Sequence, residues 1–131
     1  MYLQLLEYVS FDLPEGFTPY YIYGIMVDNK EVGRITFREG SLQEHHFDGH
    51  IGYHIEEVYR GHHYAYQACL LLQKERGFHQ VILTCDPSNQ ASLKTIQKLH
   101  ARYLETKTIP KSQRRFFHQD EKEKMIFLWE V

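Results

Sequence analysis

Apolar residues recur along the chain with two different spacings, which predict a series of strands interrupted by two helices. Strand-like stretches are short, rich in β-branched and aromatic residues, and bounded by turn-forming residues. Seven such strands are expected, over residues 1–8, 20–27, 32–37, 50–55, 80–85, 102–109 and 124–131. The first four follow one another without a helix between them.

Two segments have the spacing of an amphipathic helix instead. In the first, the apolar positions i, i+3, i+4 and i+7 are Ala65, Ala68, Cys69 and Leu72. Gly77 is a natural end for this helix, with basic residues in its last turn. The second helix is expected to begin after Ser88 or Asn89, either of which can cap it, and Ile96 and Leu99 give it an apolar side.

The resulting element order is β-β-β-β-α-β-α-β-β. Turn residues 28–31 join the second and third strands as a hairpin, and a strand–helix–strand unit follows the four-stranded meander. We therefore expect an α+β fold whose central sheet is mixed but mostly antiparallel, with helices on its faces. A length of 131 residues suits one domain over 1–131.

Composition argues against several classes of protein. A formal net charge of −2 gives no basic surplus for nucleic acid, and no apolar run has the length of a membrane span. The first residues lack the basic start and cleavage site of a signal peptide. Cys69 and Cys85 are expected to be buried thiols in a reducing compartment, so we expect a cytoplasmic protein.

The strand at 50–55 leads into the first helix through the sequence Arg60-Gly61-His62-His63-Tyr64-Ala65. The first backbone N–H groups of a helix have no partner inside it, and the helix dipole is positive at that end. This geometry suits a phosphate group. Arg60 can add charge there, and His62 and His63 can add donors.

This turn resembles the pyrophosphate loop of the GNAT superfamily of N-acetyltransferases, whose pattern is Q/R-x-x-G-x-G/A. Arg60 matches the first position and Ala65 the last, whereas His63 stands where the family has its central glycine. A short glycine motif alone is a weak signal, and an ordinary strand-to-helix turn is the alternative interpretation.

A second stretch resembles the GNAT segment in which an Asn opens a helix that ends in Lys-Leu-Gly-Phe. Asn89, Ser92, Lys98 and Leu99 are in register with it, and His100 and Ala101 replace the Gly-Phe pair. Two imperfect motifs in the right order and separation support each other. The resemblance covers roughly residues 32–103.

The resemblance implies that acetyl-CoA is the co-substrate. In relatives, the pantetheine arm pairs with the strand before the loop, where that strand splays from the next one. Here this is Tyr53 to Ile55, and Asn89 matches the position that hydrogen-bonds the arm from the other side. The cofactor-binding residues that the resemblance implies are Tyr53, Ile55, Arg60, Gly61, His62, His63, Tyr64, Ala65, Asn89 and Ser92.

The catalytic groups are not where the family pattern would place them. Amine acetylation needs a neutral amine to attack the thioester and then a proton for the thiolate. The base positions of relatives correspond to Gly49, Ile51 and Thr84, and the tyrosine acid position to Ile96. We predict His50 and Tyr53 as catalytic substitutes, Tyr53 on the acceptor side and His50 through a shift of strand register.

Three functions remain open. The leading interpretation is an N-acetyltransferase that moves an acetyl group from acetyl-CoA to a primary amine, on a small molecule or a protein N-terminus, by direct attack. The second is an acyl-CoA-binding GNAT-like module with little or no catalysis, acting as a sensor or interaction protein. The third is an interaction domain whose loop binds another phosphate. No metal site is expected, because a strand would hold His46, His50 and His54 far apart.

The connection between the first two strands is unusually short. Most relatives place two helices there, and those helices help to wall the acceptor site, whereas residues 10–19 are too few for both. We therefore expect an open groove, or its completion by a second copy in a homodimer through Tyr20, Tyr21, Phe116 or Phe117. Acidic residues near the mouth would attract a cationic acceptor: Glu39, Glu44, Asp48, Glu56 and Glu57.

Overall fold

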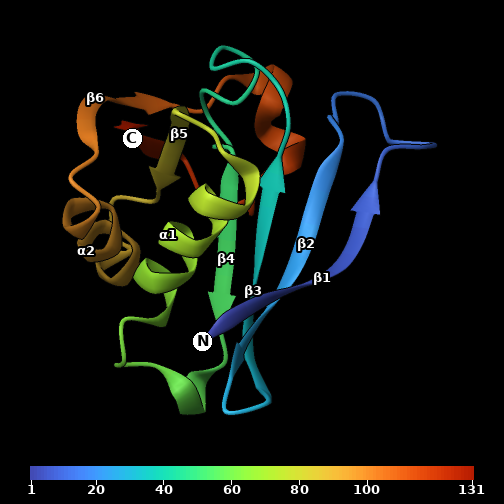
Figure 1. Cartoon of the computed structure of the whole chain (residues 1–131). Helices are drawn as coiled ribbons and strands as arrows, with labels where there is room; N and C mark the ends of the chain where they lie inside the picture. Colours follow the sequence, from blue (N-terminus) through green and yellow to red (C-terminus); the bar gives the residue numbers. More distant parts are fainter.

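The computed structural model describes all 131 residues, and its elements follow the predicted order (Figure 1). They are β1 (Tyr2–Val9), β2 (Tyr20–Val27), β3 (Lys30–Arg38), β4 (Ile51–Ile55), η1 (Glu57–Tyr59), α1 (Tyr64–Arg76), β5 (Gln80–Cys85), α2 (Gln90–Lys98), β6 (Arg102–Thr108), η2 (Lys111–Phe116) and β7 (Glu123–Glu130). The α+β prediction is confirmed. The short 3-10 helices η1 and η2 were not predicted and lie in segments read as loops.

The strands form two antiparallel sheets, one in the order β1-β2-β3-β4 and the other in the order β5-β7-β6. They meet where β4 and β5 begin. There the His50 N–H donates to the Ile82 carbonyl over 2.9 Å, and the Ile82 N–H donates to Nδ1 of His50 over 2.9 Å. Beyond this junction β4 and β5 make no ladder, although they point the same way in Figure 1. The two strands therefore diverge towards the end of β4.

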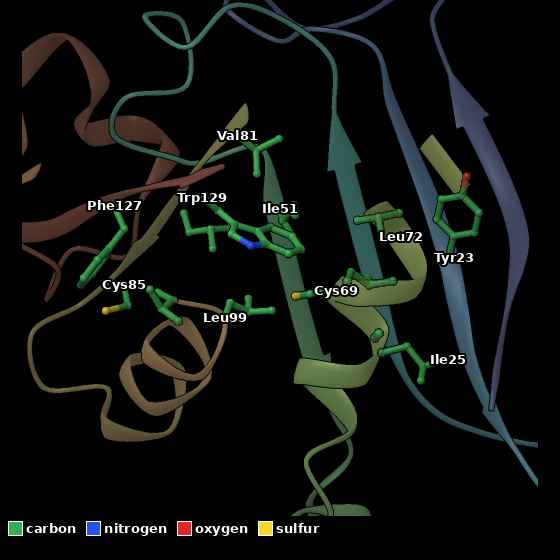
Figure 2. Close-up of a cluster of buried hydrophobic side chains, with 14 of the residues drawn as sticks. Tyr23, Ile25, Ile51, Cys69, Leu72, Val81, Cys85, Leu99, Phe127 and Trp129 are labelled. Atoms are coloured by element: carbon green, nitrogen blue, oxygen red, sulfur yellow. The ribbon is translucent and has the colours of Figure 1, made fainter. Parts of the chain in front are cut away.

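Both α-helices pack on one face of the sheets and share one apolar core (Figure 2). The core joins side chains from both sheets and both helices, among them Tyr23, Ile25, Cys69, Leu72, Val81, Leu99 and Trp129. In β5, Ile82 faces the other way and packs with Phe47 and Phe117, which come from loops. The predicted helices therefore cover the face that holds the main core, and loop residues cover the second face.

The predicted ends of the helices are present. Ala68, Cys69 and Leu72 form the buried stripe of α1, and Gly77 ends it in the left-handed conformation with φ 69°. Asn89, one of the two candidates, caps α2. Both cysteines are buried free thiols. Neither helix is long and apolar enough to cross a lipid bilayer.

Candidate functional site

A cleft of about 490 Å³ opens at the end of β4, beyond the point where β4 and β5 part. Its walls are the end of β4, the loop that leads into α1, and the first turns of α1 and α2. All of the predicted cofactor-binding residues line it except His62. The structure therefore brings the two motifs together, although they are separated in the sequence.

Several lining residues were missed by the sequence analysis. Lys94 and Lys98 lie one turn apart on α2 and place positive charge along the cleft, and Lys98 Nζ lies 4.5 Å from the centre of the Tyr66 ring. The sequence held a signal for these two residues: lysines four positions apart lie on one face of a helix, and this helix begins at the predicted cofactor residue Asn89. A cleft with this charge suits an anionic ligand.

The loop into α1 forms a cradle of free backbone donors. The N–H groups of residues 61–66 donate no hydrogen bond within the chain, since the first helical bond of α1 runs from the Gln67 N–H to the His63 carbonyl. Gly61 has φ 93°, and a Cβ there would meet open space. Arg60 folds back, donating from Nε to the Ile55 carbonyl over 2.9 Å. Consecutive free N–H groups at the positive end of a helix form an anion-binding concavity.

The missing family glycines are replaced by histidines that keep the backbone conformation of glycine. His63 has φ 61°, in the left-handed region, at the position of the loop's central glycine. His100 has φ 60° and ends α2, where the Ala101 N–H reaches the Ile96 carbonyl over 3.4 Å. Both histidines therefore hold the left-handed backbone conformation that glycine adopts most readily.

Replacing His63 with glycine should raise the free energy of unfolding by about 0.5–1 kcal/mol. The left-handed conformation costs a residue with a Cβ about 1–2 kcal/mol, and the extra freedom of glycine in the unfolded chain offsets part of that gain. Urea denaturation measures the change. His62→Gly is the control, because His62 has no positive φ. If His63→Gly is no more stable than His62→Gly, the strain at His63 is absent.

Tyr53 reaches across the cleft from β4 to α2. Its hydroxyl donates to Ser92 Oγ over 3.3 Å, and the Ser92 N–H donates to Asn89 Oδ1 over 3.1 Å. Burial is the main cause that raises the pKa of Tyr53 above its usual value, so the phenol stays protonated at neutral pH. The Asn89 amide N–H groups have no partner in the chain and are available to a ligand carbonyl.

His50 does not reach this cleft. Its side chain is 3% exposed, Nδ1 accepts the Ile82 N–H, and Nε2 donates to the Gly40 carbonyl over 3.1 Å. Burial lowers the pKa of His50, so the ring is neutral and both nitrogens are engaged. The geometry gives His50 the role of a connector between the two sheets and does not support the predicted role as a base.

The other histidines of the His46, His50 and His54 series also lie apart. His46 Nε2 is 2.7 Å from a carboxylate oxygen of Glu105, and His54 is exposed on β4. No three ligand-type side chains in the structure converge on one point. These histidines recur every fourth residue, but each has different neighbours in the structure and they do not form one site.

A larger groove, of about 940 Å³, lies on the opposite face of the first sheet. Thr36 and Arg38 of β3 form its floor, and three segments form its walls: the β1–β2 connection, the β3–β4 connection and η2. Side chains at alternate positions of a strand point to opposite faces, so Thr36 and Arg38 face away from the helices that cover Ile35. The short β1–β2 connection thus borders an open groove.

Three of the four aromatic residues expected at a homodimer interface, Tyr21, Phe116 and Phe117, make contacts within the chain. The Tyr21 ring lies 4.4 Å from that of Tyr8, and the guanidinium carbon of Arg76 lies 4.1 Å from the Tyr21 ring centre. Phe116 packs edge-on against Phe17, and Phe117 packs with the apolar cluster of the second face. Exposed apolar side chains gather instead on β1, an edge strand that carries Leu5 and other large residues.

The chain resembles known acetyltransferases in sequence profile and in fold. Residues 5–102 match the profile of the acetyltransferase (GNAT) domain family. The structure is similar to an acetyltransferase from Salmonella typhimurium that modifies the N-terminal serine of ribosomal protein L7/L12, with 18% identity and a TM-score of 0.66 over 86% of this chain and 64% of that one. It is also similar to the microcin C7 self-immunity acetyltransferase MccE, solved with acetyl-CoA and AMP, with 15% identity and a TM-score of 0.67 over 86% and 61%.

A third similar structure is a GNAT acetyltransferase from Bacillus anthracis, with 23% identity and a TM-score of 0.61 over 85% of this chain and 65% of that one. The chain therefore spans less than two thirds of the length of each of these proteins. At these identities the likeness establishes the fold alone. No curated protein sequence matches the chain.

Proposed function

The chain belongs to the GNAT acetyltransferase superfamily, and from this membership we propose that it is an acetyl-CoA-dependent N-acetyltransferase. It would transfer the acetyl group to a primary amine, on a small molecule or a protein N-terminus, by direct attack. The observation that carries the proposal is the cradle of free N–H groups at residues 61–66, at the mouth of the cleft between β4 and β5.

The cleft has a place for each part of acetyl-CoA. The cradle would take the pyrophosphate, and Lys94 and Lys98 add positive charge beside it. The His50 carbonyl and the Glu56 N–H bond to β3, so the alternation of an antiparallel ladder turns the polar backbone groups of Tyr53 and Ile55 to the free edge of β4. The Ile55 carbonyl already accepts from Arg60 Nε, which leaves the Tyr53 groups and the Ile55 N–H for a ligand. That edge would pair with the amide groups of the pantetheine arm.

Tyr53 is the side chain best placed to supply the proton of the reaction. The amine nitrogen forms a bond to the acetyl carbon, the carbon–sulfur bond breaks, and the leaving thiolate takes a proton. The raised pKa of Tyr53 keeps that proton available, and its hydroxyl lies in the cleft beside Ser92. With His50 engaged in the sheet junction, the amine would attack in its neutral form and lose its proton to water.

Acetyl-CoA should raise the melting temperature of the protein, because a ligand that binds only the folded state stabilises it. Arg60→Ala should weaken binding by about 1–3 kcal/mol, the range of a charged hydrogen bond. Calorimetric titration measures the affinity, with Arg34→Ala as control, because Arg34 is exposed on β3 and does not line the cleft. A melting temperature unchanged at millimolar acetyl-CoA would remove the cofactor from the proposal.

A second function has a specific observation in its favour. The predicted base His50 is hydrogen-bonded through both ring nitrogens and does not line the cleft, which favours an acyl-CoA-binding module without efficient catalysis. Release of free thiol from acetyl-CoA with a panel of amines separates the two functions. Binding without release would favour the module.

The setting of the protein is part of the proposal. Two buried free thiols, Cys69 and Cys85, support a cytoplasmic location, where thiols stay reduced. A homodimer remains a prediction, and the exposed apolar side chains of β1 offer it a surface.

A further inference from the structure

Arg38 is a cation on the floor of the larger groove that has no carboxylate partner. Its Nη1 donates to the Gly49 carbonyl over 3.1 Å, and no acidic side chain lies within ion-pairing distance of its guanidinium. Arg38 is half-buried, and burial lowers the pKa of Arg38 against the opposing effect of the Asp48 charge. A desolvated guanidinium with free donors favours an anionic partner.

The acidic residues that line the same groove do not supply this partner. Asp48 Oδ1 is engaged by Nδ1 of His45 at 2.9 Å, and Glu44 Oε1 accepts the Ser41 N–H over 2.8 Å. Glu15 lies on the β1–β2 connection and is exposed. The groove thus presents carboxylates on its walls and, on its floor, a guanidinium that feels the charge of Asp48 but makes no direct ion pair; Arg115 is the second cation that lines it.

The groove and the cofactor cleft meet the same strand from opposite faces. Thr36 of the groove floor pairs with Gly52 of β4, and a Cβ at Gly52 would lie 3.1 Å from Nη2 of Arg38. The next residue, Tyr53, points into the cofactor cleft. Because Gly52 has no side chain, the guanidinium lies directly over the backbone of the strand on which the acyl-bearing arm would rest.

We propose that this groove binds the acetyl acceptor and that Arg38 binds an anionic group, a carboxylate or a phosphate, carried by the acceptor close to its amine. The inference rests on the proposed acetyltransferase function and specifies its substrate class. The acceptor is a zwitterion whose ammonium is attracted by the carboxylates of the walls before it loses a proton and attacks. The anionic group of the acceptor forms the direct ion pair that Arg38 does not make within the chain.

The first test compares amines that differ only in the anion. The pairs are β-alanine with β-alaninamide and phosphoethanolamine with ethanolamine, and kcat/KM is expressed per neutral amine. The wild type should favour at least one anionic member by about 10-fold or more, mainly through KM, as expected for a charged hydrogen bond. Arg38→Gln should abolish this preference and Arg38→Lys should retain part of it. Arg34→Gln, on the same strand but exposed and paired with Glu31, should keep it.

The second test needs no turnover and no variant. The NMR signal of the Arg38 Nε–H group is followed in the wild type during addition of N-acetyl-β-alanine, its amide, or inorganic phosphate. Saturable shifts with an anion but not with the amide support anion binding at Arg38, and this result stands whether or not acetyl-CoA binds, so failure of the site and failure of the proposed function are told apart. Equal shifts with charged and neutral compounds, or none at all, would overturn it. Acetyl transfer without any anion preference would overturn it while leaving the acetyltransferase function in place.

Discussion

His50→Ala is expected to lower the free energy of unfolding by about 3 kcal/mol, because the ring joins the two sheets. Its removal leaves the Ile82 N–H buried without a partner, which costs about 1–3 kcal/mol, and also breaks the bond to the carbonyl of Gly40, an exposed residue. The cavity left by the ring adds to this loss. Urea or thermal denaturation measures the change, with His54→Ala on the same strand as an exposed control.

The pH dependence of this loss identifies its origin. Burial lowers the pKa of His50, so below about pH 6.5 the unfolded chain binds a proton that the folded protein does not. The wild type therefore loses the contribution of His50 as the pH falls below that value, and the alanine variant has none to lose. The difference in stability between the two proteins should shrink between pH 7.5 and pH 5.5.

The neighbouring His45 works in the opposite direction, because its Asp48 partner raises the pKa of His45 against the effect of burial. It is present in both proteins, but its ring centroid lies 4.8 Å from that of His50, so the same comparison is repeated in a His45→Gln background to isolate His50. If His50→Ala instead kept full stability and lost only kcat, the residue would be a base and the assigned connector role would be wrong.

For His50, the sequence predicted only the face of the strand on which its side chain lies. Alternation predicted that His50 lies on the other face of the strand from Ile51 and Tyr53, and in the structure those two residues pack at the main core while His50 does not. Its partner, however, is the backbone of Ile82, which lies 32 residues further along the chain. No local pattern encodes where two diverging strands touch. A histidine at a strand end therefore looks the same in sequence whether it joins two sheets or binds a substrate.

The cofactor cleft was more predictable, because its parts are local. A loop that enters a helix, a cap residue and a strand edge each have a signature within a few residues. His63 and His100 show the limit of such sequence signatures. Each occupies a position where the family pattern has glycine, and each has a left-handed backbone conformation that the residue type does not reveal. Arg38 had no signature at all, because its burial depends on connections that fold over the far face of the sheet.

Tyr53→Phe should lower kcat by about 100-fold, the lower end of the range for a group that transfers a proton in the transition state. The ring that packs in the cleft is kept, so acetyl-CoA affinity should change little. Tyr66→Phe removes a hydroxyl from the same cleft and is the matched control, expected to keep most of its activity. Equal activity in wild type and Tyr53→Phe would remove Tyr53 from the mechanism.

The pH profile of the wild type completes this prediction. An alkyl amine with a pKa of about 10.4 is neutral in fewer than about one molecule in a thousand at pH 7, so kcat/KM should rise with pH towards the pKa of the acceptor. Tyr53 does not interrupt the rise, because burial raises its pKa above the usual tyrosine value and it stays protonated. Acceptors with an α-amino group, whose pKa is about 7.7–8.0, should react faster at pH 7 than alkyl amines. A plateau near pH 6–7 would instead reveal an enzyme base, which neither His50 nor Tyr53 could be in this geometry.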